Sequence, residues 1–173
     1  QEESLSGVSK RDTLVQLCTK LQKKITEKVN ANFKEVTKLD THLLPLTNCA
    51  FDKGGNKVVT GSYDRTCKVW DAHTGKELHT LKGHQNVVYA LAFNTPYGDK
   101  IATGSFDKTA RIWDTETGEC LHTLTGHYHE IVCLSFDPQS RFLATGAMDT
   151  TAKVYDVERG EEILSLLGHT AEI

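Results

Sequence analysis

The chain has 173 residues, of which 38% are apolar and 25% charged, and its net charge is −3 at pH 7. This composition is ordinary for a globular protein, and it lacks the basic excess typical of nucleic-acid-binding proteins. No apolar run approaches the roughly 20 residues that cross a bilayer. We therefore expect no nucleic acid partner and no membrane insertion. The five cysteines form no C-x-x-C pair, so we expect buried thiols in a reducing, cytoplasmic compartment.

The first part of the chain, residues 1–32, is predicted to form a polar tail and one amphipathic α-helix over residues 12–30. Leu14, Leu17 and Leu21 recur at the three- and four-residue steps that place side chains on one helix face. The opposite face is rich in lysine. We interpret the helix as packed on its neighbour with a solvated basic face, and a partner-binding helix is the alternative.

From Phe33 onward the pattern changes to that of strands, and one decapeptide occurs three times. It reads SYDRTCKVWD at Ser62–Asp71, SFDKTARIWD at Ser105–Asp114 and AMDTTAKVYD at Ala147–Asp156. The copies begin 43 and 42 residues apart. A Gly–His pair precedes the second and third copies, and Thr41–His42 stands in its place before the first. Self-similarity at such a period indicates a repeat architecture.

Each repeat is predicted to contain four short strands. An apolar strand follows each histidine, and because it is apolar on both alternating faces we expect it to be buried on both sides. These strands are Leu46–Phe51, Val88–Phe93 and Ile131–Phe136. A second strand ends in Thr-Gly-Ser or Thr-Gly-Ala, a turn at an aspartate follows, and the third strand ends in Trp or Tyr. A single unit cannot bury both of its faces, so such units stack around an axis.

Gly–His followed after about 28 residues by Trp–Asp resembles the WD40 repeat of β-propellers. The resemblance implies a mainly β fold: a WD40 β-propeller fragment of about three four-stranded blades plus the start of a fourth, preceded by the helix. The propeller part is expected over residues 33–173, with repeats at about 42–81, 84–124 and 127–166 and a truncated fourth.

The family also implies a structural tetrad in each blade, in which the histidine, a strand hydroxyl, the turn aspartate and the Trp are hydrogen-bonded. The residues carried over are His42, Ser62, Asp64 and Trp70; His84, Ser105, Asp107 and Trp113; and His127, Asp149 and Tyr155. In the third set Ala147 replaces the hydroxyl and Tyr155 the indole. We therefore expect that network to be weaker or rearranged.

A narrower resemblance is carried by LLPLTN at Leu43–Asn48, by TGSYDRTCKVW and by NVVYALAFNTPYGDKIATGSFDKTARIWD. These stretches are similar to the family of dynein assembly factors with WD repeats. That family implies a non-catalytic scaffold and cargo adaptor for assembly and transport of outer-arm axonemal dynein into cilia or flagella. Its implied partners are outer-arm dynein subunits and the intraflagellar transport complex. Its implied location is the cytoplasm, the cilium or flagellum and the basal body. The alternative is a generic WD40 scaffold, such as a ubiquitin-ligase substrate receptor.

Recurring His, Asp and Ser residues could suggest a catalytic triad. A catalytic constellation occurs once in a chain, whereas this set returns in every unit at one offset, so we interpret it as structure. The run His127–Glu130 has no third metal ligand at a suitable spacing, and there is no Gly-rich phosphate loop. We therefore expect no enzyme activity, catalytic residue, cofactor or metal.

Function then depends on surfaces. Partners of such propellers commonly use the loops before each histidine-led strand and the residue ahead of the turn aspartate. The candidate partner-binding residues are Tyr63, Phe106, Met148, Gln85, Asn86, Tyr128, His129 and Glu130, with Arg65 and Lys108 as candidates for an acidic partner. We interpret Lys68, Arg111 and Lys153 of the third strands as solvated edge charges.

Overall fold

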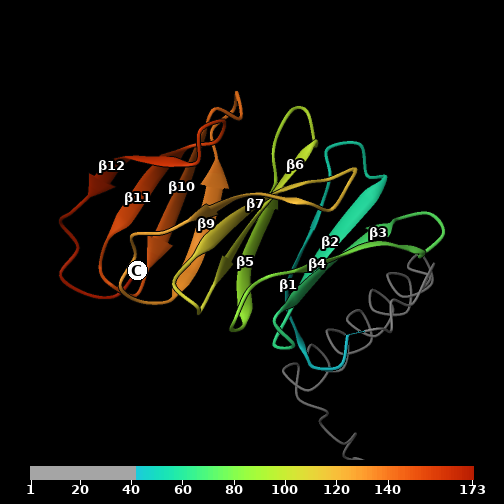
Figure 1. The fold of residues 1–173 in the computed structure, drawn as a ribbon, viewed down its shortest axis with the longest axis horizontal. Helices are drawn as coiled ribbons and strands as arrows, with labels where there is room; N and C mark the ends of the chain where they lie inside the picture. The colour runs from blue at the N-terminus through green and yellow to red at the C-terminus, as the bar shows by residue number, and fades with distance from the viewer. Residues whose placement is uncertain (1–41) are drawn as a thin grey trace, which may run out of the picture. The chain divides into compact units, whose positions relative to one another are not determined.

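A computed structural model of the chain describes residues 42–173, which form twelve strands in three antiparallel sheets (Figure 1). The first sheet holds β1 Leu46–Phe51, β2 Lys57–Ser62, β3 Thr66–Asp71 and β4 Glu77–Lys82; the second holds β5 Val88–Phe93, β6 Lys100–Ser105, β7 Ala110–Asp114 and β8 Cys120–Leu124; the third holds β9 Ile131–Phe136, β10 Phe142–Ala147, β11 Ala152–Asp156 and β12 Glu161–Leu166. Residues 42–173 contain no helix long and apolar enough to cross a membrane. The helix predicted over residues 12–30 lies outside the described residues, and the domain boundary at residue 33 stays a prediction.

Each sheet is a meander in which strands adjacent in sequence pair with each other. In the second sheet Lys100 of β6 lies opposite Asp114 of β7, and Gly104 lies opposite Ala110. This register leaves only the turn Phe106–Thr109 to join the two strands. Short connections of this kind join antiparallel neighbours, whereas parallel neighbours need a long crossover. The turn spacing seen in the sequence therefore fixes the topology of each sheet.

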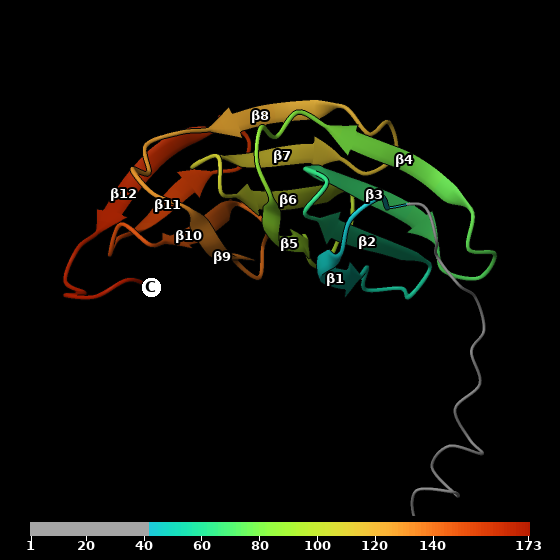
Figure 2. The same cartoon turned by 90° about the horizontal axis from the view of Figure 1, so that it is seen from below.

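The three sheets pack face to face in chain order. β5 contacts β1 and β2, and β9 contacts β5 and β6. Figure 2 shows β1, β5 and β9 along one margin of the stack and β4, β8 and β12 along the opposite margin. One apolar core lies between the first two sheets and includes Val69, Leu91 and Trp113. A second core lies between the second and third sheets and includes Ile112 and Leu143.

Glycine in the Thr-Gly-Ser motif permits the close approach of the next sheet. A Cβ atom added to Gly104 would lie 2.7 Å from Cγ2 of Ile131, and one added to Gly61 would lie 3.0 Å from Cδ2 of Leu91. The first distance is shorter than real Cβ contacts, and the second is tight enough that Leu91 would have to shift by a few tenths of an ångström. Glycine inside a strand commonly marks such an approach of a neighbouring element, so this position sets the separation of the sheets.

Burial of the innermost strands differs from the sequence expectation. β5 lies between two sheets, and most of its side chains are buried, as predicted. The prediction is wrong for β1, where Leu46 and Phe51 are exposed. It is also wrong for β9, which is only partly buried. The reason is packing: within residues 42–173, only β5 has a sheet on each side.

In the second and third sheets, the turn between the third and fourth strands is hydrogen-bonded to the connection between the first and second strands. The backbone N–H of Thr115 donates to the carbonyl of Asp99 at 2.9 Å, and Val157 N–H donates to Arg141 O at 2.9 Å in the third sheet. Both side chains are buried. The hydroxyl of Thr115 has no hydrogen-bond partner within the described residues, so a polar group is buried there without compensation.

Replacing this hydroxyl by a methyl group is expected to stabilise the protein. Thr115→Val should raise the free energy of unfolding by about 1 kcal/mol, because an unpaired buried hydroxyl is removed at constant shape. The reciprocal change Val157→Thr is the matched control and should lower the free energy of unfolding by a similar amount. Urea unfolding of both variants measures the effect, and a destabilised Thr115→Val protein would contradict the assignment.

Candidate interaction face

A buried histidine in each sheet is hydrogen-bonded through both ring nitrogens. In the second sheet His84 Nδ1 lies 2.8 Å from Asp107 Oδ2, and Nε2 lies 2.8 Å from Thr103 Oγ1. Trp113 Nε1–H donates to the same hydroxyl at 2.9 Å. A neutral imidazole satisfies the whole set, because Trp donates to Thr, Thr donates to Nε2 and Nδ1–H donates to the carboxylate.

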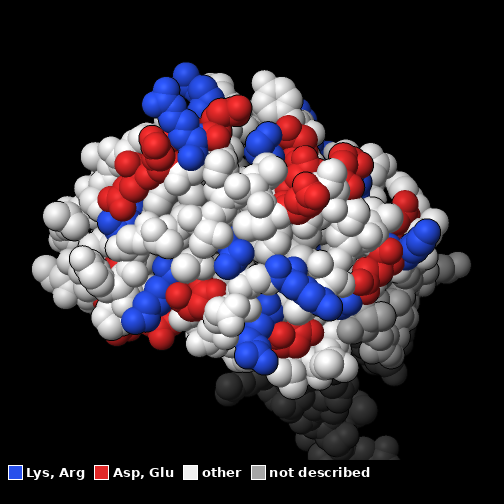
Figure 3. Space-filling view, viewed as in Figure 1, with Lys and Arg blue, Asp and Glu red and all other residues white. Residues whose placement is uncertain are grey.

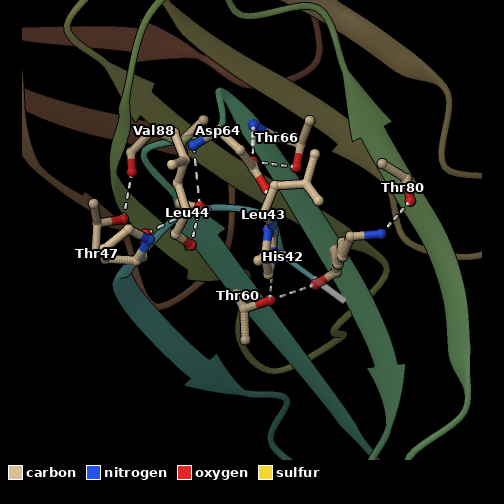
Figure 4. Close-up of polar contacts among 12 residues, drawn as sticks. His42, Leu43, Leu44, Thr47, Thr60, Asp64, Thr66, Thr80 and Val88 are labelled. Atoms are coloured by element: carbon tan, nitrogen blue, oxygen red, sulfur yellow. Dashed lines mark hydrogen bonds and ion pairs between the residues drawn. The ribbon is translucent and has the colours of Figure 1, made fainter. Parts of the chain in front are cut away.

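The same network occurs in the other two sheets. His42 contacts Asp64 at 2.8 Å and Thr60 at 2.9 Å, and Figure 4 shows this set with Thr66 beside the carboxylate. His127 contacts Asp149 and Thr145, each at 2.8 Å. His42 therefore makes the same contacts as the histidines of the two Gly–His pairs.

The hydroxyl assigned from the sequence is wrong in both tetrads that named one. The hydroxyl between histidine and Trp belongs to Thr60 or Thr103, not to Ser62 or Ser105. Ser105 Oγ donates to the carbonyl of Asn86 at 3.1 Å and accepts the N–H of Asp107 at 3.0 Å. Thr and Ser stand two residues apart on one strand, so both side chains lie on the same face. The sequence pattern could not distinguish them.

The third network is rearranged, as expected, but not because a hydroxyl is missing. Thr145 supplies the hydroxyl to His127, and Ala147 stands at the position of Ser105. The actual difference is Tyr155, whose hydroxyl donates to the carbonyl of Thr125 at 3.0 Å. Burial, with a smaller contribution from the charge of Glu162, raises the pKa of Tyr155 to about 12.

The turn aspartates are held in the ionised form. Burial opposes ionisation of Asp107, but hydrogen bonds from His84, Thr109 and the backbone of Gln85 outweigh it and keep the pKa of this carboxyl well below its usual value. Asp149 has a similarly lowered pKa, with burial again opposed by hydrogen bonds. Each carboxylate is thus committed to contacts within its own sheet.

The geometry does not resemble a hydrolytic site. Ser105 Oγ is bonded to Asn86 and Asp107, whereas a nucleophile should contact the histidine base. Within residues 42–173 no group of three or more His, Cys, Asp or Glu side chains could hold a metal ion.

The network places the candidate partner-binding residues along one end of the strands. The N–H of Phe106 donates to Val87 O at 3.0 Å, that of Tyr63 to Pro45 O at 3.1 Å and that of Met148 to Glu130 O at 2.9 Å. Each turn therefore lies against the loop that precedes an innermost strand. We call the surface formed by these turns and loops the turn face. Its exposed candidates are Tyr63, Arg65, Gln85, Asn86, Lys108, Tyr128 and His129, and its partly buried ones are Phe106, Glu130 and Met148.

The turn aspartate also fixes the residue that follows each histidine. The backbone N–H groups of Leu43, Gln85 and Tyr128 donate to Oδ2 of the aspartate of their own sheet at 3.3, 2.9 and 2.9 Å. Their side chains are exposed, 91% for Leu43 and 79% for Tyr128. Leu43 was missed in the sequence, although it stands one residue after His42 as Gln85 does after His84.

Tyr89 is a second residue that the sequence did not reveal. It is bulged out of the register between Val88 and Ala90, and its ring stacks on Phe106 with centroids 5.2 Å apart. A β-bulge redirects a side chain, so an aromatic residue inside an apolar strand is partly exposed here. No simple sequence signal marks the bulge.

Comparisons with known proteins agree with this geometry. The profile of the family described as "WD domain, G-beta repeat" matches residues 33–71, 75–114 and 118–156. The chain belongs to the WD40 repeat family. Solved structures agree: "Structure of U3-55K" shares the WD40 fold with a TM-score of 0.74 at 24% identity, over 78% of this chain and 42% of that one. The fold predicted for residues 42–173 is therefore confirmed.

A designed protein is also similar. "Crystal structure of the computationally designed Ika4 protein" matches at 36% identity with a TM-score of 0.73, over 81% of this chain and 83% of that chain.

Curated proteins match part of the chain at higher identity. A Xenopus laevis protein named "Dynein assembly factor with WD repeat domains 1" is 58% identical over 96 residues, which are 56% of this chain and 23% of that protein. The protein of the same name from Danio rerio is 61% identical over 82 residues, or 47% of this chain and 20% of that protein. The chain thus matches less than a quarter of the length of these relatives.

The third-strand cations of the WD40 blades are not solvated edge charges, which corrects the sequence interpretation. The side chains of Lys68 and Lys153 are only 12% and 11% exposed, and each pairs with a glutamate on the outer strand of its blade. Arg111 lies over the Trp113 ring at 5.8 Å. Elsewhere the surface has mixed charge, and Figure 3 shows acidic and basic groups interspersed on the side in view.

Removal of the bridging hydroxyl should destabilise a blade more than removal of the turn serine. Thr103→Val is expected to cost about 2–3 kcal/mol, because His84 and Trp113 each lose a buried hydrogen bond. Ser105→Ala should cost less, since Ala147 occupies that position in the third blade. Thr103→Ser keeps the hydroxyl and serves as the control. Equal losses in Thr103→Val and Ser105→Ala, measured by chemical denaturation, would contradict the assignment.

The lowered aspartate pKa values make the free energy of unfolding depend on pH. A folded-state pKa below the unfolded value, about 3.9 for Asp, means that the unfolded chain binds protons first as the pH falls. The stabilisation is complete above about pH 5 and is lost progressively below it. Asp107→Asn removes one such carboxylate, so its unfolding free energy should be lower at pH 7 and fall less steeply between about pH 4 and pH 2. Urea unfolding across this range measures the slope, and an unchanged slope would count against the network.

Proposed function

We propose that this chain is part of a non-catalytic scaffold that acts as a cargo adaptor in the assembly of outer-arm axonemal dynein and its transport into cilia or flagella. Its partners are outer-arm dynein subunits and the intraflagellar transport complex. It works in the cytoplasm and at the cilium or flagellum and its basal body.

The observation that carries this proposal is the identity of 58% over 96 residues with a protein whose name states dynein assembly. Matched residues at this level include surface positions as well as the core, whereas a fold alone can be shared at much lower identity. A similar match to the Danio rerio protein of the same name supports the same proposal.

The polar networks support a scaffold without catalysis. Each turn aspartate and histidine of the three blades is hydrogen-bonded within its own blade. Such groups tie a loop to a turn, and they are buried away from any substrate. The exposed side chains around them are of the kinds that anchor protein partners, since aromatic residues and Arg are enriched in interface hot spots.

The turn face is the surface that we assign to partner binding. Tyr63 and Tyr128 are 47% and 79% exposed, and Leu43 adds an exposed apolar side chain. No ion pair of Arg65 or Lys108 occurs within the described residues, and both side chains are exposed. A partner segment with an apolar or aromatic anchor and acidic neighbours fits this combination.

The first test is co-precipitation of the natural protein that carries this chain, tagged at its own locus in ciliated cells. Outer-arm dynein subunits and intraflagellar transport subunits should be recovered together. Recovery of neither class would contradict the dynein role, and recovery of ubiquitin-ligase adaptors in their place would favour a general WD40 receptor.

The second test separates the turn face from the rest of the surface. The double change Tyr63→Ala and Tyr128→Ala should reduce recovery of dynein subunits about tenfold or more, as loss of aromatic anchors does. Tyr97→Ala is the matched control, because Tyr97 is 71% exposed but lies in the β5–β6 connection, at the other end of the strands. Equal recovery with the double variant and the control would reject the turn face as the dynein-binding surface.

A further inference from the structure

A cation, an acid and a hydroxyl meet on the third and fourth strands of two blades. In the first blade Lys68 Nζ lies 2.6 Å from Glu77 Oε2 and 3.1 Å from Thr80 Oγ1. In the third blade Lys153 Nζ lies 2.8 and 2.9 Å from the two carboxylate oxygens of Glu162 and 2.7 Å from Ser165 Oγ. The hydroxyl also donates to the carboxylate in each blade.

The second blade carries a thiol where the other two carry the acid. Arg111, Cys120 and Thr123 occupy the three positions, and Arg111 Nη1 lies 3.6 Å from Cys120 Sγ. The thiol donates to the carbonyl of His122 at 3.4 Å, and the sulfur lies 3.9 Å from Thr123 Oγ1. The cation and hydroxyl that hold a carboxylate in the neighbouring blades are therefore present here without one.

The only hydrogen-bond acceptor of the Arg111 side chain within the described residues is the weakly accepting Cys120 sulfur. The Nε atom of Arg111 is buried and has no hydrogen-bond partner within the described residues. A guanidinium group offers five N–H donors, and a thiol is a weak acceptor. A carboxylate-like group at Cys120 would give Nη1 a charged acceptor like those that Lys68 and Lys153 have in the neighbouring blades.

We propose that Cys120 is a site of oxidation by hydrogen peroxide, and that Arg111 and Thr123 bind the resulting sulfinate as their counterparts bind Glu77 and Glu162. The side chain of Arg is longer than that of Lys, and a sulfinate on Cys is shorter than Glu. The two differences in length compensate. A sulfinate on Cys120 can therefore reach the longer Arg111, just as the longer Glu77 and Glu162 reach the shorter Lys68 and Lys153.

The chemistry takes two equivalents of peroxide. The thiolate sulfur attacks one peroxide oxygen, the O–O bond breaks and, with uptake of a proton, sulfenic acid and water form. The sulfenic sulfur then attacks a second peroxide, gains the second oxygen and releases water, and the sulfinic acid loses its proton. In each step sulfur gives up an electron pair and peroxide is reduced.

Exposure and charge together make Cys120 selective. Cys67 is 1% exposed, and peroxide cannot reach it. Cys49 and Cys133 are exposed like Cys120, so the expectation of buried thiols holds only for Cys67 among the described cysteines. Within the described residues neither of these two sulfurs has a hydrogen bond to a cationic side chain. Arg111 is placed to pair with an anionic product at Cys120, and no cation in the described part of the chain is so placed at the other two, so these two thiols are internal controls of similar access.

The test exposes the folded chain to limiting hydrogen peroxide and maps oxidised cysteines by peptide mass spectrometry. Sulfinate should form at Cys120 several-fold faster than at Cys49 and Cys133, and Arg111→Gln should remove this advantage while Arg111→Lys keeps part of it. Equal rates at the three thiols of the unmodified chain would overturn the proposal, and this comparison needs no variant to fold.

A second measurement addresses binding of the sulfinate. Oxidation should raise the thermal midpoint by a few degrees, because a new charge-assisted contact forms. Cys120→Asp, which resembles the sulfinate in length and charge, should reproduce the rise without peroxide, and Cys120→Ala should abolish the response. A midpoint that falls on oxidation, or that rises equally in Cys120→Ala, would overturn the role of Arg111 and Thr123.

Discussion

The structure depends on a buried imidazole that is hydrogen-bonded on both sides. His84 joins Thr103 in the second strand of its blade to Asp107 in the following turn, and Trp113 completes the set from the third strand. The histidine itself comes from the loop before the first strand, so one side chain connects all of these elements. Leaving any buried member unpaired would cost about 1–3 kcal/mol, a large fraction of the stability of a small domain.

The same constraint creates the surface that we assign to partners. Asp107 accepts the N–H of Gln85 as well as the imidazole, and this contact holds the loop beside the turn. The side chain after each histidine therefore points outward at a fixed place. Because the backbone is held by the network, the residue at that position can vary freely, as Leu43 and Tyr128 do. A structural core of polar groups thus supports a variable exterior.

The sequence predicted the strand count, the three histidines and their aspartates, because the period of 42–43 residues aligns them without ambiguity. It failed where a choice depended on three-dimensional direction. Thr103 and Ser105 share a strand face, and only the distance to His84 separates them. Lys68 is paired rather than solvated, because the register of β3 and β4 brings it to Glu77, nine residues away in the sequence. Tyr89 lies in a bulge, which has no simple sequence signal.

The three blades also serve as controls for one another. What recurs at the same offset in each blade is explained by folding, as the His–Asp–Thr sets show. A residue that differs between blades at an equivalent position is not explained by the shared fold. Such positions are where chemistry or recognition can be specific. Cys120, which occupies the position of Glu77 and Glu162 in the other blades, is one case. Thr115, which occupies the position of Val157 in the third blade, is another. The first difference leaves a cation without an acid and the second leaves a hydroxyl without a partner. Only the first is exposed to a reagent, so it is the one that can carry a function.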